Sequence, residues 1–392
     1  MQIRDHWQLN PDIDFLNHGS FGACPSVVLQ EQQNLISELE NDPIRFLAPE
    51  RELTSKLDEV RDTVASLVKV PASDLAFVRN ATDGVNAVLN SLPLKEGDQI
   101  LITNHGYNAC NNAARHVAEK TGAEVTVAEI PFPLDSDTDV IVEIEKQITP
   151  QTRLILIDHV TSPTGLIFPV EQVISLAHAK GIQVLVDGAH APGMIPLNLT
   201  AMAPDYYTAN HHKWLCGPKT SGFLFVQPEL QTQVRPNLIS HGANRKCRNR
   251  SRFITEFDWT GTYDPTPLLA VPAAILFLET LYPEGLDQLY QKNHDAAVKA
   301  RQVLCHALQT EPPSSNAMIG SMASVPLDAT RFTKHECSPA ALQQILFQQH
   351  RLELPVFQLW DSDHWCLRIS MQAYNEVHQI DRLGSVLTEL TG

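Results

Sequence analysis

The stretch YYTANHHKWLCGP, residues 206–218, contains a single lysine among aromatic, histidine and small residues. The apolar run GFLFV at 222–226 follows it, so Lys213 lies between two predicted β-strands. A lysine in that position loses solvent, and because desolvation lowers its pKa, its amine can act as a nucleophile near neutral pH. The stretch therefore predicts a Schiff-base lysine, and a solvated loop lysine is the alternative.

A second stretch, GIQVLVDGAH at 181–190, is an apolar, β-branched run that ends in polar residues. This pattern is typical of a buried parallel strand whose C-terminal end carries the chemistry, where open α/β sheets bind ligands. A pyridoxal-phosphate site needs a lysine that holds the aldehyde as an imine and a carboxylate that keeps the ring nitrogen protonated. Lys213 and Asp187 are the two residue types required.

Several motifs carry a resemblance to a known family. DGAH at 187–190, His212-Lys213 and GPK at 217–219 resemble the aspartate and lysine motifs of class V, fold-type I pyridoxal-phosphate enzymes. That family includes cysteine desulfurases, kynureninase-like enzymes and isopenicillin N epimerase. FLNHGSFG at 15–22 and FDWTGTYDP at 257–265 are most similar to the isopenicillin N epimerase branch. The resemblance covers about residues 15–368.

The resemblance implies pyridoxal 5'-phosphate as cofactor and an α/β fold with a mostly parallel, seven-stranded sheet. It implies an N-terminal segment, 1–20, that contributes to the active site, a large cofactor-binding domain, 21–265, and a small α+β C-terminal domain, 266–392. The catalytic residues that it implies are Lys213, Asp187 and His190.

Composition fits this interpretation. The chain has 392 residues, enough for two domains, and its net charge of -16 argues against nucleic acid or an anionic membrane as a partner. Its seven cysteines are scattered without a C-x-x-C pair, which favours free thiols in a reducing cytosol.

The N-terminus does not look like a secretory signal, and the most apolar later run, 268–278, contains Pro272 and is too short to span a bilayer. A soluble, cytoplasmic protein is expected. The basic run RKCRNRSR at 245–252 reads as a solvated loop, or as an attractor for an acidic substrate or the phosphate.

The turn NATDG at 80–84 follows a predicted strand and opens a predicted helix at 85–92. A helix N-terminus offers free N–H groups and a positive dipole end to a phosphate, although Thr82 can also be an ordinary N-cap. In the family, the matching turn holds the cofactor phosphate. The resemblance therefore assigns the phosphate to Ala81, Thr82 and Asp83, with the N–H groups of Asp83 and Gly84.

Further phosphate contacts are implied by the resemblance alone. Asn210 and His212 occupy positions where the family uses a serine and a histidine to contact the phosphate. Thr262 lies in a segment similar to the one that reaches the neighbouring subunit's phosphate, which implies a homodimer with shared active sites.

The family places an aromatic or histidine ring over the pyridoxal ring from the segment NHGYN at 104–108. Tyr107 is the first choice because it has the larger flat face, and His105 is the second. The alternative for Tyr107 is a core position with its hydroxyl bonded. His190 replaces the desulfurases' glutamine as a donor to the ring oxygen, and Ser162 replaces their asparagine.

The segment HWCLRIS at 364–370 alternates like a strand, and the family binds the substrate's α-carboxylate with the arginine found here, Arg368. A strand arginine facing solvent is the alternative. Asn17 and His18 are further predicted substrate-binding residues. The segment 355–364 has no cysteine, and Cys366 lies inside the predicted strand, so transfer of sulfur through a protein persulfide is not expected.

The predicted chemistry begins with removal of the substrate's α-proton by Lys213, while Asp187 keeps the ring protonated. Reprotonation on the opposite face gives epimerisation, loss of a β-thiol gives a carbon–sulfur lyase, and reprotonation at the cofactor gives transamination. The candidates for a second acid are His18, Tyr107 and His212.

The sequence predicts a pyridoxal-phosphate enzyme that acts on an amino acid or an aminoacyl side chain, similar to isopenicillin N epimerase. A carbon–sulfur lyase or a class V aminotransferase is the alternative within the class. No metal is predicted; a distant alternative is a metal-dependent hydrolase with Asp187, His190, His211 and His212 as ligands.

Overall fold

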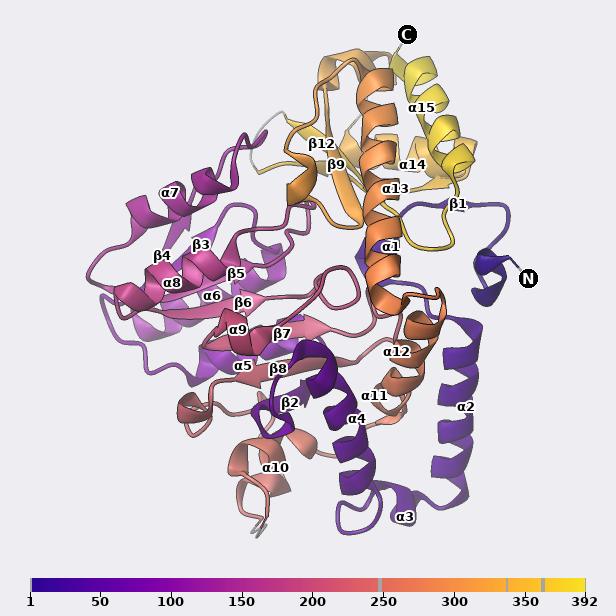
Figure 1. Cartoon of the computed structure of the whole chain (residues 1–392). Coiled ribbons are helices and arrows are strands. Elements are labelled where there is room, and N and C mark those ends of the chain that lie inside the picture. The colour runs from indigo at the N-terminus through magenta and orange to yellow at the C-terminus, as the bar shows by residue number, and fades with distance from the viewer. Residues whose placement is uncertain (1, 246–248, 336–337, 361–363, 392) are drawn as a thin grey trace.

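The structure is a computed structural model that describes residues 2–245, 249–335, 338–360 and 364–391. Its centre is a seven-stranded sheet in the order β2-β8-β7-β6-β5-β3-β4 (Figure 1). All of its pairs are parallel except those of β8, which runs antiparallel to β2 and β7. The strands are β2 (Leu75–Val78), β3 (Gln99–Thr103), β4 (Glu124–Ala128), β5 (Thr152–Asp158), β6 (Gln183–Asp187), β7 (Tyr206–Asn210) and β8 (Gly222–Val226).

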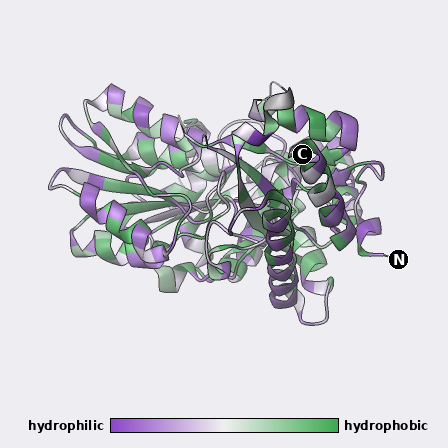
Figure 2. Ribbon diagram, turned by 90° about the horizontal axis from the view of Figure 1, so that it is seen from above, coloured by the Kyte–Doolittle hydropathy of each residue, from purple (hydrophilic) through white to green (hydrophobic). Residues whose placement is uncertain are grey.

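Helices cover both faces of this sheet, which explains why its inner strands are apolar on both sides. One face packs on α5 (Ala81–Ser91), α6 (Asn108–Thr121) and α10 (Arg252–Asp258). The other packs on α4 (Leu53–Val68), α7 (Asp137–Gln147) and α8 (Val170–Ala179). Seen from above, the strands are largely apolar and the helices turn hydrophilic residues outward (Figure 2).

A second, antiparallel sheet in the order β11-β12-β9 lies in the C-terminal part of the chain. Its strands are β9 (Met322–Leu327), β11 (Val356–Gln358) and β12 (Trp365–Ser370). The helices there are α11 (Thr266–Leu269), α12 (Val271–Thr280), α13 (Gly285–Leu308), α14 (Pro339–His350) and α15 (Val377–Thr391).

The N-terminal segment lies against this C-terminal part (Figure 1). Strand β1 (Asp14–Phe15) pairs in parallel with β10 (Leu352–Glu353), and the short α1 (His18–Phe21) follows. Helices α2 (Ser26–Asn41) and α3 (Pro43–Leu47) then lead to α4, and α9 (Leu199–Met202) precedes β7.

The predicted α/β fold with a mostly parallel seven-stranded sheet is confirmed. The larger sheet lies within residues 75–226 and the smaller within 322–370, while the domain boundaries at 20 and 265 stay a prediction. In the described ranges, no single helix has the length and apolar composition of a membrane span, and one pair bent by 73°, Thr266–Thr280 with Gly285–Leu308, has them only jointly. Residues 246–248 of the basic run lie outside the described residues.

Candidate active site

Lys213 lies in the loop between β7 and β8, as predicted. Its Nζ is 3.0 Å from Nε2 of His190 and 6.0 Å from the centre of the Tyr107 ring. Burial lowers the pKa of Lys213 to about 8, although the charge of Asp187 acts in the opposite direction. A substantial fraction of the amine is therefore unprotonated slightly above neutral pH.

Asp187 ends β6 at the edge of the sheet where the lysine loop lies. Its Oδ1 accepts a hydrogen bond from the Ala189 N–H at 2.9 Å, and its Oδ2 accepts one from the Cys110 thiol at 3.1 Å. Burial raises the pKa of this carboxyl, while the two hydrogen bonds and the charge of Lys213 lower it. The carboxylate is thus fixed in orientation by two donors.

A second buried carboxylate was not predicted from the sequence. Asp158 ends β5 in register with Asp187, and its two oxygens accept from the backbone N–H of Tyr107 at 3.4 and 3.2 Å. Burial, and next the charge of Asp187, raise the pKa of Asp158 well above its usual range. Because Tyr107 is the N-cap of α6 and Cys110 lies in its first turn, both strand-end carboxylates hold the start of this helix.

The two candidates for the stacking ring lie in different environments. His105 is fully buried, with Nδ1 2.8 Å from Thr164 Oγ1 and Nε2 3.1 Å from the Ile130 carbonyl oxygen. Tyr107 is 43% exposed and faces Lys213. The structure therefore brings the first choice beside the lysine and places the second in the core; the alternative of a core position for Tyr107 does not hold.

The phosphate turn differs from the prediction in its hydrogen bonds. Asn80 is the N-cap of α5, so its side chain accepts from the Asp83 N–H at 2.9 Å and its carbonyl accepts from the Gly84 N–H at 3.2 Å. The N–H of Ala81 donates to Asn210 Oδ1 at 2.9 Å. These three N–H groups are engaged around the start of the helix, and Thr82 is not the N-cap.

Thr82 and His212 lie close to the groups just described. The side chain of Thr82 lies near the Cys110 thiol and counteracts the rise in the pKa of that thiol, so the start of α5 lies close to that of α6. His212 Nδ1 is 3.3 Å from the Ser221 carbonyl oxygen, and burial lowers the pKa of its ring to about 4. A phosphate contact from either side chain stays a prediction.

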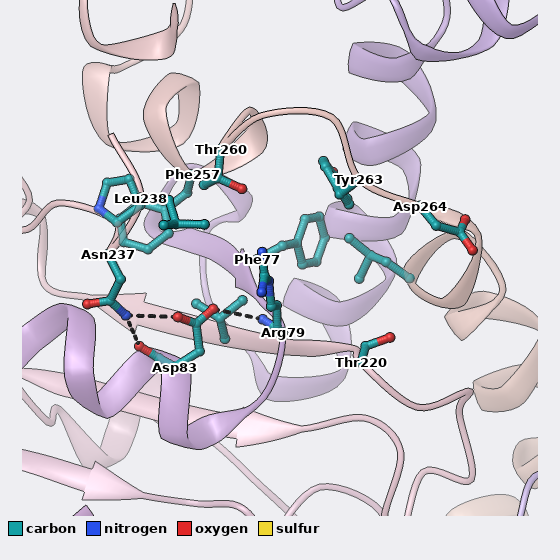
Figure 3. A pocket seen from close by; sticks show the side chains of 13 residues that line it. Phe77, Arg79, Asp83, Thr220, Asn237, Leu238, Phe257, Thr260, Tyr263 and Asp264 are labelled. Atoms are coloured by element: carbon teal, nitrogen blue, oxygen red, sulfur yellow. Dashed lines mark hydrogen bonds between the residues drawn. The ribbon is translucent and has the colours of Figure 1, made fainter. Parts of the chain in front are cut away.

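A cavity of about 280 Å³ borders the phosphate turn (Figure 3). On one side Asp83 accepts from the Arg79 N–H and from the Asn237 amide; on the other lie Thr260 and Tyr263. Thr262 is an exposed residue of this latter segment. If Thr262 contacts a neighbouring subunit as predicted, that subunit would lie against the surface next to this cavity.

Arg368 is 1% exposed on β12, so it does not face solvent as the alternative held. Its Nη1 donates to the carbonyl and hydroxyl oxygens of Ser162, and its Nη2 donates to Ser20 Oγ at 3.1 Å. Its Nε has no hydrogen-bond partner among the described residues. A buried guanidinium with a spare donor suits a carboxylate ligand.

The N-terminal segment packs directly on the lysine loop. His18 Nε2 is 3.0 Å from the Lys213 carbonyl oxygen and its Nδ1 is 2.8 Å from the Tyr374 hydroxyl, so both ring nitrogens are engaged. Gly22 has φ +69°, and a Cβ there would lie 2.0 Å from the His212 carbonyl oxygen. Asn17 bonds Glu353 at 3.1 Å and Ser20 Oγ at 2.6 Å, which places it one contact away from Arg368.

The four ligands of the metal-hydrolase alternative do not converge. Within the described part of the chain, no group of three or more histidine, cysteine, aspartate or glutamate side chains is arranged to hold a metal ion. His211 stacks on the ring of Phe223 at 5.7 Å between ring centres. The geometry gives this alternative no support.

Comparison with known proteins gives the family. A family model described as aminotransferase class-V matches residues 17–383. The chain belongs to the class-V aminotransferase family. An isopenicillin N epimerase from Amycolatopsis lactamdurans is 31% identical to this class-V enzyme over 99% of the chain and 98% of that protein. A probable chloroplastic L-cysteine desulfhydrase from Arabidopsis thaliana is 27% identical over 97% of the chain and 83% of that protein.

Solved structures agree on the fold. A structure of C-DES with glycine linked to its pyridoxal-phosphate cofactor has a TM-score of 0.82, with 19% identity, over 99% of this chain and 100% of that one. The Escherichia coli cysteine desulfurase CsdA has a TM-score of 0.79, with 21% identity, over 99% and 97%. The predicted family, fold and cofactor are confirmed.

The residues of this class-V enzyme fit pyridoxal phosphate by their chemistry. Lys213 offers an amine of lowered pKa for the aldehyde, and Asp187 offers a buried, oriented carboxylate for the ring nitrogen. His190, 2% exposed and next to Lys213, offers a ring nitrogen to the ring oxygen. These three groups converge from β6 and the loop after β7.

Proposed function

We propose that this enzyme removes the α-proton of an amino acid or an aminoacyl side chain, with Lys213 as the base. The observation that carries the proposal is the amine of Lys213, which has a pKa of about 8 and is held 3.0 Å from His190 beside the oriented Asp187. A base with a pKa near the working pH is efficient in proton transfer.

Each residue has a role in this proposal. Bound pyridoxal phosphate supplies an electron sink for the broken carbon–hydrogen bond. With the cofactor bound, Asp187 would pair with its ring nitrogen, and His190 and Ser162 would supply contacts for its ring oxygen. Thr82, Asn210 and His212 would hold the phosphate, and Tyr107 would cover the ring. Arg368 binds the substrate's carboxylate, because its guanidinium is buried, fixed by Ser20 and Ser162, and has a spare donor.

We propose epimerisation as the outcome, with Tyr107 as the second acid. Among the three candidates, His18 has both ring nitrogens engaged and His212 has one nitrogen bonded to Ser221. Tyr107 is the exposed candidate that faces Lys213, and burial of its hydroxyl raises its pKa, which keeps the proton available for donation. The similarity to isopenicillin N epimerases, at 31% and 30% identity, supports this outcome.

A carbon–sulfur lyase is the second candidate. Relatives named L-cysteine desulfhydrase and, from Schizosaccharomyces pombe, hercynylcysteine sulfoxide lyase are 27% and 28% identical. Cys366, the cysteine nearest Arg368 in sequence, is fully buried on β12. Sulfur released from a substrate would therefore leave as a small molecule rather than on a protein persulfide.

Proton NMR in heavy water tests the proposal, using purified enzyme loaded with cofactor and a panel of amino acids and cysteine conjugates. Epimerisation predicts loss of the α-proton signal with no new compound other than the stereoisomer. A keto acid with a released thiol would identify the lyase, and a keto acid alone would identify an aminotransferase. Lys213→Ala is the control, and unchanged exchange in that variant would refute the role of Lys213.

We also propose a cytoplasmic homodimer with shared active sites, acting on a small amino-acid-type substrate and binding neither nucleic acid nor membrane. Exposed apolar side chains at Phe21 (73%) and Ile44 (72%) and the exposed Thr262 support a subunit interface, and the net charge of -16 disfavours polyanions. Sedimentation analysis tests the dimer. Recovery of activity on mixing Lys213→Ala with a Thr262→Glu variant would support site sharing, and a monomer would refute it.

A further inference from the structure

His190 is held from both sides by two residues that are adjacent in the chain. The indole N–H of Trp214 donates to His190 Nδ1 at 3.3 Å, and Lys213 Nζ lies 3.0 Å from His190 Nε2. Trp214 is fully buried and His190 is 2% exposed, so neither ring exchanges these partners with bulk water. The ring of His190 therefore links the indole to the lysine amine.

The chemistry of these three groups allows one arrangement of protons. An indole nitrogen is only a donor, so Nδ1 of His190 must be the acceptor and carry no hydrogen. Burial lowers the pKa of His190 well below 6.5, so the ring is neutral and its single hydrogen is on Nε2. An ammonium cannot accept a hydrogen bond. The contact with Nζ is therefore donated by His190 to a neutral amine.

We propose that Trp214 is a positioning residue that fixes the tautomer of His190, so that His190 presents an Nε2–H toward Lys213. Without the indole donor, the hydrogen could move to Nδ1, and Nε2 could then accept from a lysine ammonium. Trp214 thus favours the amine form of Lys213, the form that acts as a base.

The role of Trp214 in catalysis rests on the proposed function, in which Lys213 is the base and His190 contacts the cofactor. In the loaded enzyme, a fixed Nε2–H is the donor required toward an acceptor oxygen on the cofactor ring. Besides His190, the groups whose charges act on Lys213 are Asp187, Arg368, Asp158 and Cys110. None of these four contacts the indole nitrogen in a hydrogen bond of the described residues, so the only one of those hydrogen bonds that Trp214→Phe removes is the one to His190. The ring of Trp214 also packs on His18, at 4.9 Å between ring centres, and the phenylalanine ring keeps an aromatic group at that contact.

Nitrogen-15 NMR of histidine-labelled, cofactor-free protein tests the tautomer directly, with the His190 signals assigned by their loss in His190→Gln. In the wild type we expect an Nε2–H signal and an unprotonated Nδ1. In Trp214→Phe, which keeps a buried ring but removes the indole N–H, we expect a mixture of tautomers. Trp7→Phe is the matched control, because Trp7 is another buried tryptophan whose N–H donates elsewhere, to the Ala23 carbonyl at 3.1 Å.

Three results would overturn the inference. They are a wild-type His190 with its hydrogen on Nδ1, a Trp214→Phe spectrum that retains a pure Nε2–H tautomer, and an equal change in Trp7→Phe. A wild-type His190 with its hydrogen on Nδ1 overturns the inference even where Trp214→Phe does not fold. Because neither cofactor nor substrate is present, a failure here leaves the proposed reaction untouched, and an absence of turnover leaves the tautomer untouched.

Discussion

Replacing Lys213 with methionine in the cofactor-free protein should change how stability depends on pH. Burial lowers the pKa of Lys213 from 10.5 to about 8. Between these values the unfolded chain binds the proton and the folded chain does not, so the free energy of unfolding rises with pH. The gap corresponds to about 3 kcal/mol, gained between pH 8 and pH 10.5. The Lys213→Met variant has no amine to titrate and cannot gain this stability.

Urea denaturation followed by tryptophan fluorescence measures the effect. The quantity of interest is the difference in unfolding free energy between the wild type and Lys213→Met, taken from about pH 7 to about pH 10.5, because other titrating groups cancel in it. Over that pH range, the unfolding free energy of the wild type should rise by about 3 kcal/mol relative to that of the variant. Lys146→Met removes a 58% exposed lysine on α7 and should follow the wild type. If the difference in unfolding free energy between the wild type and Lys213→Met stays constant with pH, the lowered pKa of Lys213 is refuted.

Three further substitutions probe the site and its support. Arg368→Lys should raise KM at least about tenfold, because a lysine cannot grip a carboxylate with two parallel hydrogen bonds; steady-state kinetics measures it. Cys110→Ala should raise the pKa of Asp187, because the thiol bond lowers it, and the pH at which the visible band of the bound cofactor titrates should shift upward. Gly188→Ala should destabilise the protein by about 1–3 kcal/mol in urea denaturation, because its Cβ would lie 2.2 Å from ring atoms of Tyr207.

Each of these three substitutions has a control substitution elsewhere in the chain or at the same position. Arg331→Lys alters an arginine whose guanidinium donates to the Leu308 carbonyl oxygen and to Thr391 Oγ1 in the C-terminal part, and it should leave KM unchanged. Cys110→Ser keeps a donor at Asp187 and should restore the titration of the wild type. Gly384 lies on α15, and a Cβ there would meet its nearest atom, a methyl group of Val303 on α13, at 3.4 Å, so Gly384→Ala should be tolerated. Equal effects in a variant and its control would contradict the reasoning in each case.

The sheet and the lysine loop could be predicted because each depends on a local pattern. The run that ends at Asp187 is apolar on both faces and closes on a carboxylate, and it forms β6 as expected. The helix predicted at 85–92 begins instead at Ala81, because the side chain of Asn80 caps it. The sequence of a turn with several residues that can cap a helix does not determine which of them becomes the N-cap.

Asp158 and Cys110 could not be assigned in the same way, because their contacts depend on the order of strands. Asp158 ends an apolar run as Asp187 does, which was an available signal. However, its register with Asp187 follows from β5 lying beside β6. The thiol of Cys110 reaches Asp187 only because α6 begins over both strand ends. The choice between His105 and Tyr107 likewise required the tertiary contacts of each ring.

The hydrogen bond between Ser20 and Arg368 joins positions that are 348 residues apart, which bears on how the protein is made. The seven-stranded sheet is complete once Val226 has been synthesised, and Arg368 follows 142 positions later. All seven strands are therefore synthesised while the lysine loop still lacks the guanidinium and β12. Catalytic competence is then a late event of biogenesis, so stalled or prematurely ended chains should carry the lysine loop without its arginine.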